Sequence, residues 1–200
     1  MSRVVKSILE MEEIEAKIVA NELENIYSDI HDDIELFMDK ANITYVEALE
    51  YVVTSNVCLW AKIYLNWEAR DYQLEMLNQG VLSRKLVLRL GRRLGKTEVM
   101  CVLTLWYGYT QRNRVSETQY DILIVGPYET QIDLIFARLT QLIDNAPILS
   151  ECIEKSVEHK IVFKNGTTIQ GKTAGASSGG TEKAGAGTRG LRGDWLYKVA

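Results

Sequence analysis

The chain has 200 residues, 46% of them apolar, and a formal net charge of −4. This is enough for one domain of ordinary size, or for one domain with an appendage. Neither a signal-peptide pattern nor an apolar run long enough to span a bilayer occurs, so we expect a soluble, intracellular protein. Three widely spaced cysteines without metal-ligand spacing predict buried free thiols, and two histidines argue against a zinc site or a histidine-based triad.

Charge divides the chain into an acidic front and a mildly basic body. Residues 1–60 contain 13 acidic and 4 basic side chains, whereas residues 61–200 contain 14 acidic and 19 basic ones. A basic body suits phosphate ligands and a nucleic-acid backbone. We therefore predict an acidic helical region over residues 1–60 and a second domain over residues 61–200.

The acidic front has helical periodicity. Residues 4–42 contain no proline or glycine, and apolar side chains recur at steps of three to five. Ser28-Asp29 or His31-Asp32 could cap a second helix, and Thr44 with Glu47 forms a capping box for the next one. The buried face of that next helix is expected to consist of Tyr45, Ala48, Leu49 and Val52. The acidic side chains most simply form a solvated face; the alternative is a docking arm for a partner subunit.

The most informative stretch runs from Lys85 to Glu98. It reads as a buried strand over residues 86–90, a tight glycine turn over residues 91–95, and the start of an apolar helix. Loops of this kind bind phosphate, because backbone N–H groups point at the anion, the lysine reaches the β- and γ-phosphates and the hydroxyl holds Mg²⁺. We therefore predict a nucleotide-phosphate loop in which Lys96 contacts phosphate and Thr97 ligates Mg²⁺.

This loop departs from the pattern G-x-x-x-x-G-K-[ST] at one position. Leu90 stands where the first glycine is expected, and Gly91 follows one residue late. A simpler interpretation is a strand–helix turn with a surface lysine, but it leaves three cations crowded together without a counter-charge. The predicted nucleotide-binding residues of the loop are Gly91, Arg92, Arg93, Leu94, Gly95, Lys96, Thr97 and Glu98.

A second candidate site element lies upstream. Gln73 is eighteen residues before Gly91, in the stretch that runs from Trp67 to Leu77. Its amide has a donor and an acceptor that can pair with the adenine edge, and Tyr72 could cover the ring. The alternative is that Tyr72 belongs to a helix core and Gln73 faces solvent.

Downstream of the loop, the pattern predicts alternating helices and strands. The helix is expected to reach about Gln111, residues 121–127 read as a strand covered on both faces, and another helix begins near Glu129. Residues 159–163 and 167–171 with Asn165-Gly166 between them predict a β-hairpin, which makes His159 a strand residue and not a catalyst.

Residues 171–193 contain eight of the chain's 14 glycines together with several basic side chains. Such a segment is either a flexible linker or a functional loop. We expect a mobile active-site loop, because a predicted strand over residues 195–200 follows it. The chain stops inside that strand, so we expect a fragment of a longer protein.

These features together resemble the large terminase subunit of tailed bacteriophages, the ATPase of the DNA-packaging motor. The resemblance covers residues 70–200, and the first 60 residues match only as a helical leader. Four segments resemble, in order, the family's adenine-recognising glutamine motif, its Walker A loop without the first glycine, its N-G-[ST]-x-I segment and the R-G before its Walker B strand. They are Arg70-Asp71-Tyr72-Gln73, Arg92 to Thr97, Asn165 to Ile169 and Leu191-Arg192-Gly193.

The resemblance implies an α/β fold with a P-loop, RecA-like ASCE ATPase core and a mainly parallel sheet, truncated before Walker B. It implies ATP and Mg²⁺ as ligands, with Lys96 stabilising the γ-phosphate and Thr97 ligating the metal. Arg92 would sense or stabilise the γ-phosphate. Arg192 would be a finger on a neighbouring subunit's nucleotide, with Arg189 as the alternative.

The resemblance further implies an ATP hydrolase that couples hydrolysis to translocation of double-stranded DNA into a procapsid. Its setting would be the host cytoplasm, in a homo-oligomeric ring with the portal protein and the small terminase subunit. No apolar strand in this chain ends in Asp-Glu, and the coupling motif and the nuclease domain are absent from it, so we expect the chain alone to bind nucleotide weakly at best and to hydrolyse ATP poorly. An Asp-Glu strand is expected within about ten residues after Ala200.

Two other functions fit parts of the sequence. A helicase-type or other DNA-translocating P-loop ATPase shares a glutamine motif and a Gly-Lys-Thr loop, although its loop usually keeps more glycines. A non-catalytic interaction module would use the acidic helices to bind a partner and the loop as a structural turn.

Overall fold

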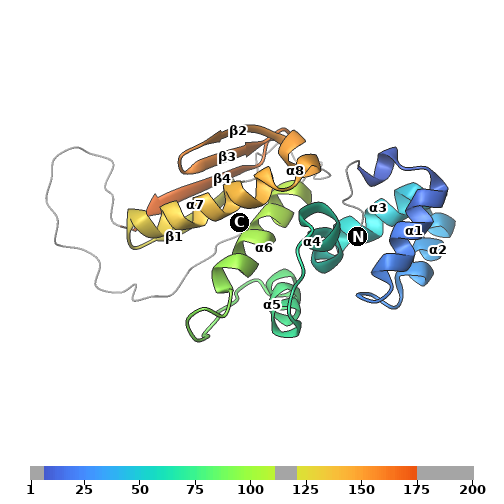
Figure 1. Ribbon diagram of the computed structural model, residues 1–200, viewed down its shortest axis with the longest axis horizontal. Helices are drawn as coiled ribbons and strands as arrows, with labels where there is room; N and C mark the ends of the chain where they lie inside the picture. Colours follow the sequence, from blue (N-terminus) through green and yellow to red (C-terminus); the bar gives the residue numbers. More distant parts are fainter. Residues whose placement is uncertain (1–6, 111–120, 175–200) are drawn as a thin grey trace, which may run out of the picture.

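The computed structural model describes residues 7–110 and 121–174. Helices form one end and the middle of an elongated molecule, and a mixed sheet with its helix lies at the other end (Figure 1). No helix in these two ranges is long and apolar enough to cross a membrane. In chain order the elements are η1 (Ile8–Glu10), α1 (Glu13–Leu23), α2 (Ile30–Ala41), α3 (Tyr45–Ser55), α4 (Val57–Leu65), α5 (Asp71–Leu82), α6 (Lys96–Thr110), β1 (Asp121–Gly126), α7 (Glu129–Asp144), α8 (Pro147–Glu151), β2 (Ile153–Val157), β3 (Lys160–Phe163) and β4 (Thr168–Thr173).

The acidic front folds into short helices whose starts follow the capping signals. The N-cap residue of α2 is Asp29, one of the two predicted positions, but its side chain makes no capping hydrogen bond to the helix. At the start of α3, Thr44 Oγ1 accepts from the Glu47 N–H at 3.3 Å, and Glu47 Oε2 accepts from the Thr44 N–H at 2.9 Å. The predicted capping box is therefore confirmed. Three of the four residues predicted for the buried face of α3 are buried, and Tyr45 is half-buried.

Glu50 on α3 connects the acidic front to the helices in the middle of the molecule through hydrogen bonds. The Tyr64 hydroxyl of α4 donates to Glu50 Oε2 at 2.6 Å, and the Tyr109 hydroxyl of α6 donates to Oε1 at 3.5 Å. Burial, with the nearby carboxylate, raises the pKa of Tyr64. Trp106 Nε1 of α6 also donates to the Thr54 carbonyl at 2.9 Å. The division predicted after residue 60 falls within α4 and stays a prediction.

The sheet is mostly antiparallel in the described residues, so the prediction of a mainly parallel sheet is wrong for this part of the chain. The strand order is β1-β4-β3-β2, in which β1 pairs with β4 in parallel while β3 pairs antiparallel with both β4 and β2. The reason is the chain path. Short turns join β2 to β3 and β3 to β4, and such turns return the chain antiparallel. Strand β2 was not predicted from the sequence.

Helices cover one face of this sheet. Burial alternates along β1, where Ile122 and Ile124 are buried and Leu123 is 38% exposed. On the covered face, a Cβ at Gly171 of β4 would lie 2.5 Å from Ile132 of α7, so strand and helix meet as closely as glycine allows. The prediction that both faces of β1 are covered is therefore wrong for the described residues.

The predicted hairpin with Asn165-Gly166 at its turn is confirmed and joins β3 to β4. Gly166 has φ 88°, and Asn165 Oδ1 accepts from the Thr167 N–H at 2.9 Å. The same side chain donates from Nδ2 to the Gly108 carbonyl of α6 at 2.8 Å. One asparagine therefore forms the turn and fastens the hairpin to the helix.

Helices α6 and α7 lie where the sequence predicts them. None of the three cysteines forms a disulfide; Cys101 of α6 is buried, whereas Cys58 and Cys152 are half-buried, so the prediction of buried thiols is confirmed for Cys101 alone. The predicted start of α7 near Glu129 is confirmed, and the buried face of this helix consists of Ile132, Ile135, Phe136, Leu139, Leu142 and Ile143. Beyond residue 174, the predicted glycine-rich loop and the predicted strand over residues 195–200 lie outside the described residues.

Candidate functional site

Residues 86–90 lead from α5 into the predicted phosphate loop without joining the sheet. They carry no regular secondary structure, and Val87 is 82% exposed while Leu86 and Leu88 are half-buried. The prediction of a buried strand here is therefore wrong in the described structure. A strand requires a neighbour for its N–H and C=O groups, and a run of apolar residues does not by itself supply one.

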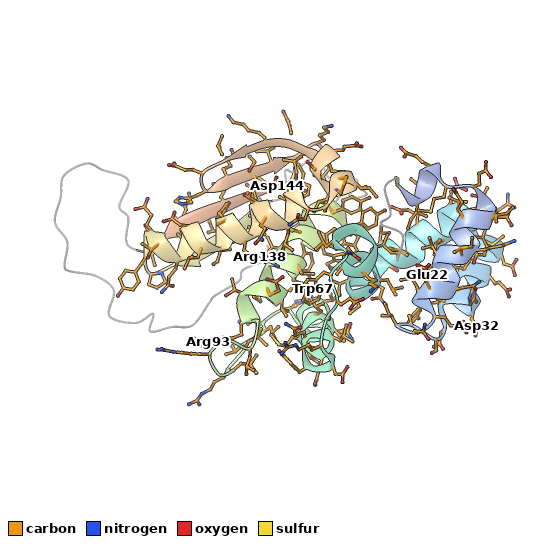
Figure 2. The ribbon with its side chains drawn as sticks, in the orientation of Figure 1. Glu22, Asp32, Trp67, Arg93, Arg138 and Asp144 are labelled. Atoms are coloured by element: carbon orange, nitrogen blue, oxygen red, sulfur yellow. The ribbon has the colours of Figure 1, made fainter. Side chains whose placement is uncertain are left out.

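The loop over residues 91–95 turns through two residues in the left-handed region. Arg93 has φ 63° and Gly95 has φ 71°. Glycine adopts this conformation freely, whereas a residue with a Cβ does so at a cost of about 1–2 kcal/mol. Figure 2 shows Arg93 at the tip of the loop, pointing away from the body of the protein.

Helix α6 begins at this loop without a side-chain cap. The Val99 N–H donates to the Gly95 carbonyl at 3.0 Å, which makes Gly95 the N-cap residue. Glycine has no side chain to accept from the N–H groups of residues 96–98, which also lack intrahelical acceptors. These amides, together with the positive end of the helix dipole, suit an anionic ligand such as phosphate.

Lys96, the first residue of α6, folds back over the loop. Its Nζ donates to the Leu90 carbonyl at 3.0 Å and to the Gly91 carbonyl at 2.7 Å. The ammonium group is therefore held at the loop by neutral acceptors. A phosphate oxygen would be a stronger, charged acceptor for the same group.

Gln73 of α5 packs directly against the loop. It is 7% exposed, its Oε1 accepts from the Arg70 N–H at 3.0 Å, and its Nε2 would lie 2.5 Å from a Cβ at Gly95. The structure thus brings the predicted glutamine and the predicted loop together, and the alternative that Gln73 faces solvent is wrong. Its oxygen is engaged in the start of α5, which leaves the amide N–H groups for a ligand. Tyr72 is half-buried against the core.

The other predicted residues divide between solvent and the interior. Those exposed around the loop are Gly91, Arg92, Arg93, Leu94 and Thr97. Glu98 is half-buried, and its carboxylate accepts hydrogen bonds from Trp67 and Arg138. No motif in the sequence predicted these contacts. Arg192 and Arg189 lie outside the described residues.

A separate open groove of about 770 Å³ lies between α7 and the β2–β3 turn. His159 stands in that turn, so its prediction as a strand residue is wrong, and its Nε2 lies 2.6 Å from Asp133 Oδ1 of α7. None of the residues that line the groove belongs to the phosphate loop. In residues 7–110 and 121–174, no group of three or more His, Cys, Asp or Glu side chains is placed to hold a metal ion.

Comparison with known proteins gives no relative from which the role of this site could be inferred. No protein-family model matches the sequence, and a search of curated proteins found no match.

Proposed function

We propose that the loop over residues 91–97 binds the phosphates of ATP with Mg²⁺. The observation that carries this proposal is the convergence of three features on Gly95. They are the uncapped start of α6, the Lys96 ammonium held at the loop, and the Gln73 amide packed against the glycine. Amides, a lysine and a hydroxyl at one helix start are the groups that bind a nucleotide polyphosphate with its metal.

The proposed roles follow from the chemistry of each side chain. Lys96 exchanges its two carbonyl acceptors for the β- and γ-phosphates, because charged acceptors bind an ammonium more strongly. Thr97, exposed in the first turn of α6, ligates Mg²⁺, which takes its remaining ligands from phosphate and water. Arg92 supplies a second cation for the γ-phosphate. Gln73 and Tyr72 face the base, with Gln73 donating from its amide nitrogen.

We further propose that this chain is part of an ATP hydrolase that drives double-stranded viral DNA into a procapsid in the host cytoplasm. The order and spacing of four motifs in residues 70–200, with the basic charge of residues 61–200, support this setting. Its partners would be DNA, the portal protein, the small terminase subunit and further copies of the chain in a ring. Arg192 would then act on a neighbouring subunit's nucleotide.

Calorimetric titration of ATP into the chain, with and without Mg²⁺, tests the nucleotide site. Lys96→Ala should weaken binding about 10–100-fold, because a charge-assisted hydrogen bond contributes about 1.5–3 kcal/mol. Lys155→Ala removes a lysine from an exposed position on β2 and should leave the affinity unchanged. Equal affinities for the two variants would remove Lys96 from the site.

The metal role has its own pair of variants. Thr97→Ala should abolish the gain in ATP affinity that Mg²⁺ provides, whereas Thr97→Ser retains the hydroxyl and should retain the gain. Failure of the unmodified chain to bind Mg·ATP at millimolar concentration would refute the proposed function as a whole.

A further inference from the structure

Glu98 is in the first turn of α6 but directs its carboxylate away from the loop. Trp67 Nε1 donates to Oε1 at 3.1 Å, Arg138 Nε donates to Oε2 at 2.6 Å, and Arg138 Nη2 donates to Oε1. One carboxylate thus joins the segment before α5, the start of α6, and α7. Figure 2 shows Arg138 on the side of α7 toward α6, and Trp67 near the start of α5.

Both partners of Glu98 are themselves fixed in place. The Trp67 N–H donates to the Ala61 carbonyl at 3.0 Å, and Arg138 Nη1 donates to Gln141 Oε1 at 2.5 Å. The side chains of Arg138 and Glu98 are 32% and 21% exposed, so this pair is better shielded than a surface ion pair. The hydrogen bond to Glu98 raises the pKa of Arg138. A two-pronged arginine–carboxylate contact fixes orientation as well as distance.

The position of Glu98 gives this contact an electrostatic consequence for the loop. Glu98 follows Thr97 directly and shares the first helical turn with Lys96. A bare carboxylate at this place would repel the phosphates that the loop is proposed to bind. With an effective dielectric constant of about 20, a unit charge roughly 10 Å from a bound phosphate would cost about 1.7 kcal/mol, which is on the order of tenfold in affinity. Arg138 removes that penalty by pairing with Glu98.

We propose that Arg138 and Trp67 are positioning residues of the phosphate loop that act through Glu98. Arg138 neutralises the carboxylate beside the phosphates, and Trp67 with Arg138 holds the first turn of α6 against α7. This inference rests on the proposed nucleotide site. It adds two residues outside the loop that hold the site in its binding geometry.

The test compares Mg·ATP and Mg·ADP affinities in Arg138→Gln, Glu98→Gln, the double variant and Trp67→Phe, with thermal unfolding of each unliganded chain. Arg138→Gln should weaken ATP binding on the order of tenfold, and ADP binding less, because ATP carries more charge. The double variant should regain most of that loss, since Glu98→Gln removes the unpaired charge. Trp67→Phe keeps an aromatic side chain but loses part of the indole and its hydrogen bond to Glu98, so it should weaken the binding of both ligands equally by a few-fold.

Several outcomes would overturn the inference. The inference is wrong if Arg138→Gln binds ATP as tightly as the unmodified chain. It is also wrong if the double variant binds ATP no more tightly than Arg138→Gln. If Arg138→Gln does not fold, Arg138→Lys keeps the charge without the two-pronged contact, and a tenfold loss of ATP affinity in it would refute neutralisation. Lys96→Ala separates the two proposals: if it weakens ATP binding about 10–100-fold while the Arg138 variants have no effect, only this inference fails. If the unmodified chain does not bind ATP, both fail.

Discussion

The left-handed backbone conformation of Arg93 predicts whether glycine or alanine at position 93 gives the more stable protein. Arg93 has φ 63°, whereas its neighbour Arg92, also exposed in the same loop, is not among the residues with positive φ. Replacing each arginine once by glycine and once by alanine removes the same side chain at both positions. The difference in stability between glycine and alanine therefore isolates the backbone effect.

The difference in stability between glycine and alanine should have opposite signs at positions 93 and 92. At position 93, glycine avoids about 1–2 kcal/mol of Cβ crowding and loses about 0.5–1 kcal/mol through its freer unfolded chain. Arg93→Gly should therefore be more stable than Arg93→Ala by about 0.5–1 kcal/mol. At position 92 only the second effect applies, so Arg92→Gly should be less stable than Arg92→Ala by about 0.5–1 kcal/mol.

Urea unfolding, followed by circular dichroism of the helices, measures these differences. Thermal unfolding offers a second readout, in which about 1 kcal/mol corresponds to a shift of about 2–4 °C for a chain of this size. The sign of the glycine–alanine difference should reverse between positions 93 and 92. The same sign at both positions would refute the assignment of a strained turn to Arg93.

Two further predictions concern residues outside the loop. Burial, reinforced by Glu98, raises the pKa of the Cys101 thiol from about 9 to about 12, so its contribution to stability is complete below pH 9 and is lost as the pH rises toward 12. The loss should be about 1.4 kcal/mol per pH unit, and Cys101→Ala should remove this slope from urea midpoints measured between pH 8 and 11. Asn165→Asp keeps the oxygen that accepts from Thr167 but loses the donor to the Gly108 carbonyl, and should lower the unfolding free energy by about 1–3 kcal/mol. Asn21→Asp, the same change on the exposed face of α1, should cost little, and equal midpoints would contradict the role of Asn165.

Local signals predicted local structure well. The capping box of Thr44 and Glu47, the turn at Asn165-Gly166 and the helix begun by Lys96 all depend on neighbours within a few residues, and the structure has each of them. Strands depend on partners elsewhere in the chain. Residues 86–90 have a strand-like sequence but no described partner, whereas β2 has four exposed residues out of five and forms because β3 lies beside it.

In the candidate site, too, contacts between residues close in sequence were predictable and contacts between distant residues were not. The loop could be read from Gly95, Lys96 and Thr97, because the motif is contiguous. The packing of Gln73 on Gly95 could be suspected only from order along the chain. The contact between Glu98 and Arg138 spans 40 residues and follows from how α6 and α7 cross, which no pattern in either helix encodes.

The strain at Arg93 bears on whether the loop is built for a ligand. Two of the other non-glycine residues with positive φ, Asn42 and Asn66, are C-caps that end α2 and α4, a place where asparagine is favoured. Arginine has no such local reason to be left-handed. Strain of this kind persists where the surrounding structure or a function requires it. If Arg93→Gly is more stable than Arg93→Ala yet binds ATP more weakly than Arg93→Ala, the strain serves the ligand, because both variants lack the guanidinium group. If the two variants bind ATP equally well, the turn is only the path by which the chain enters α6.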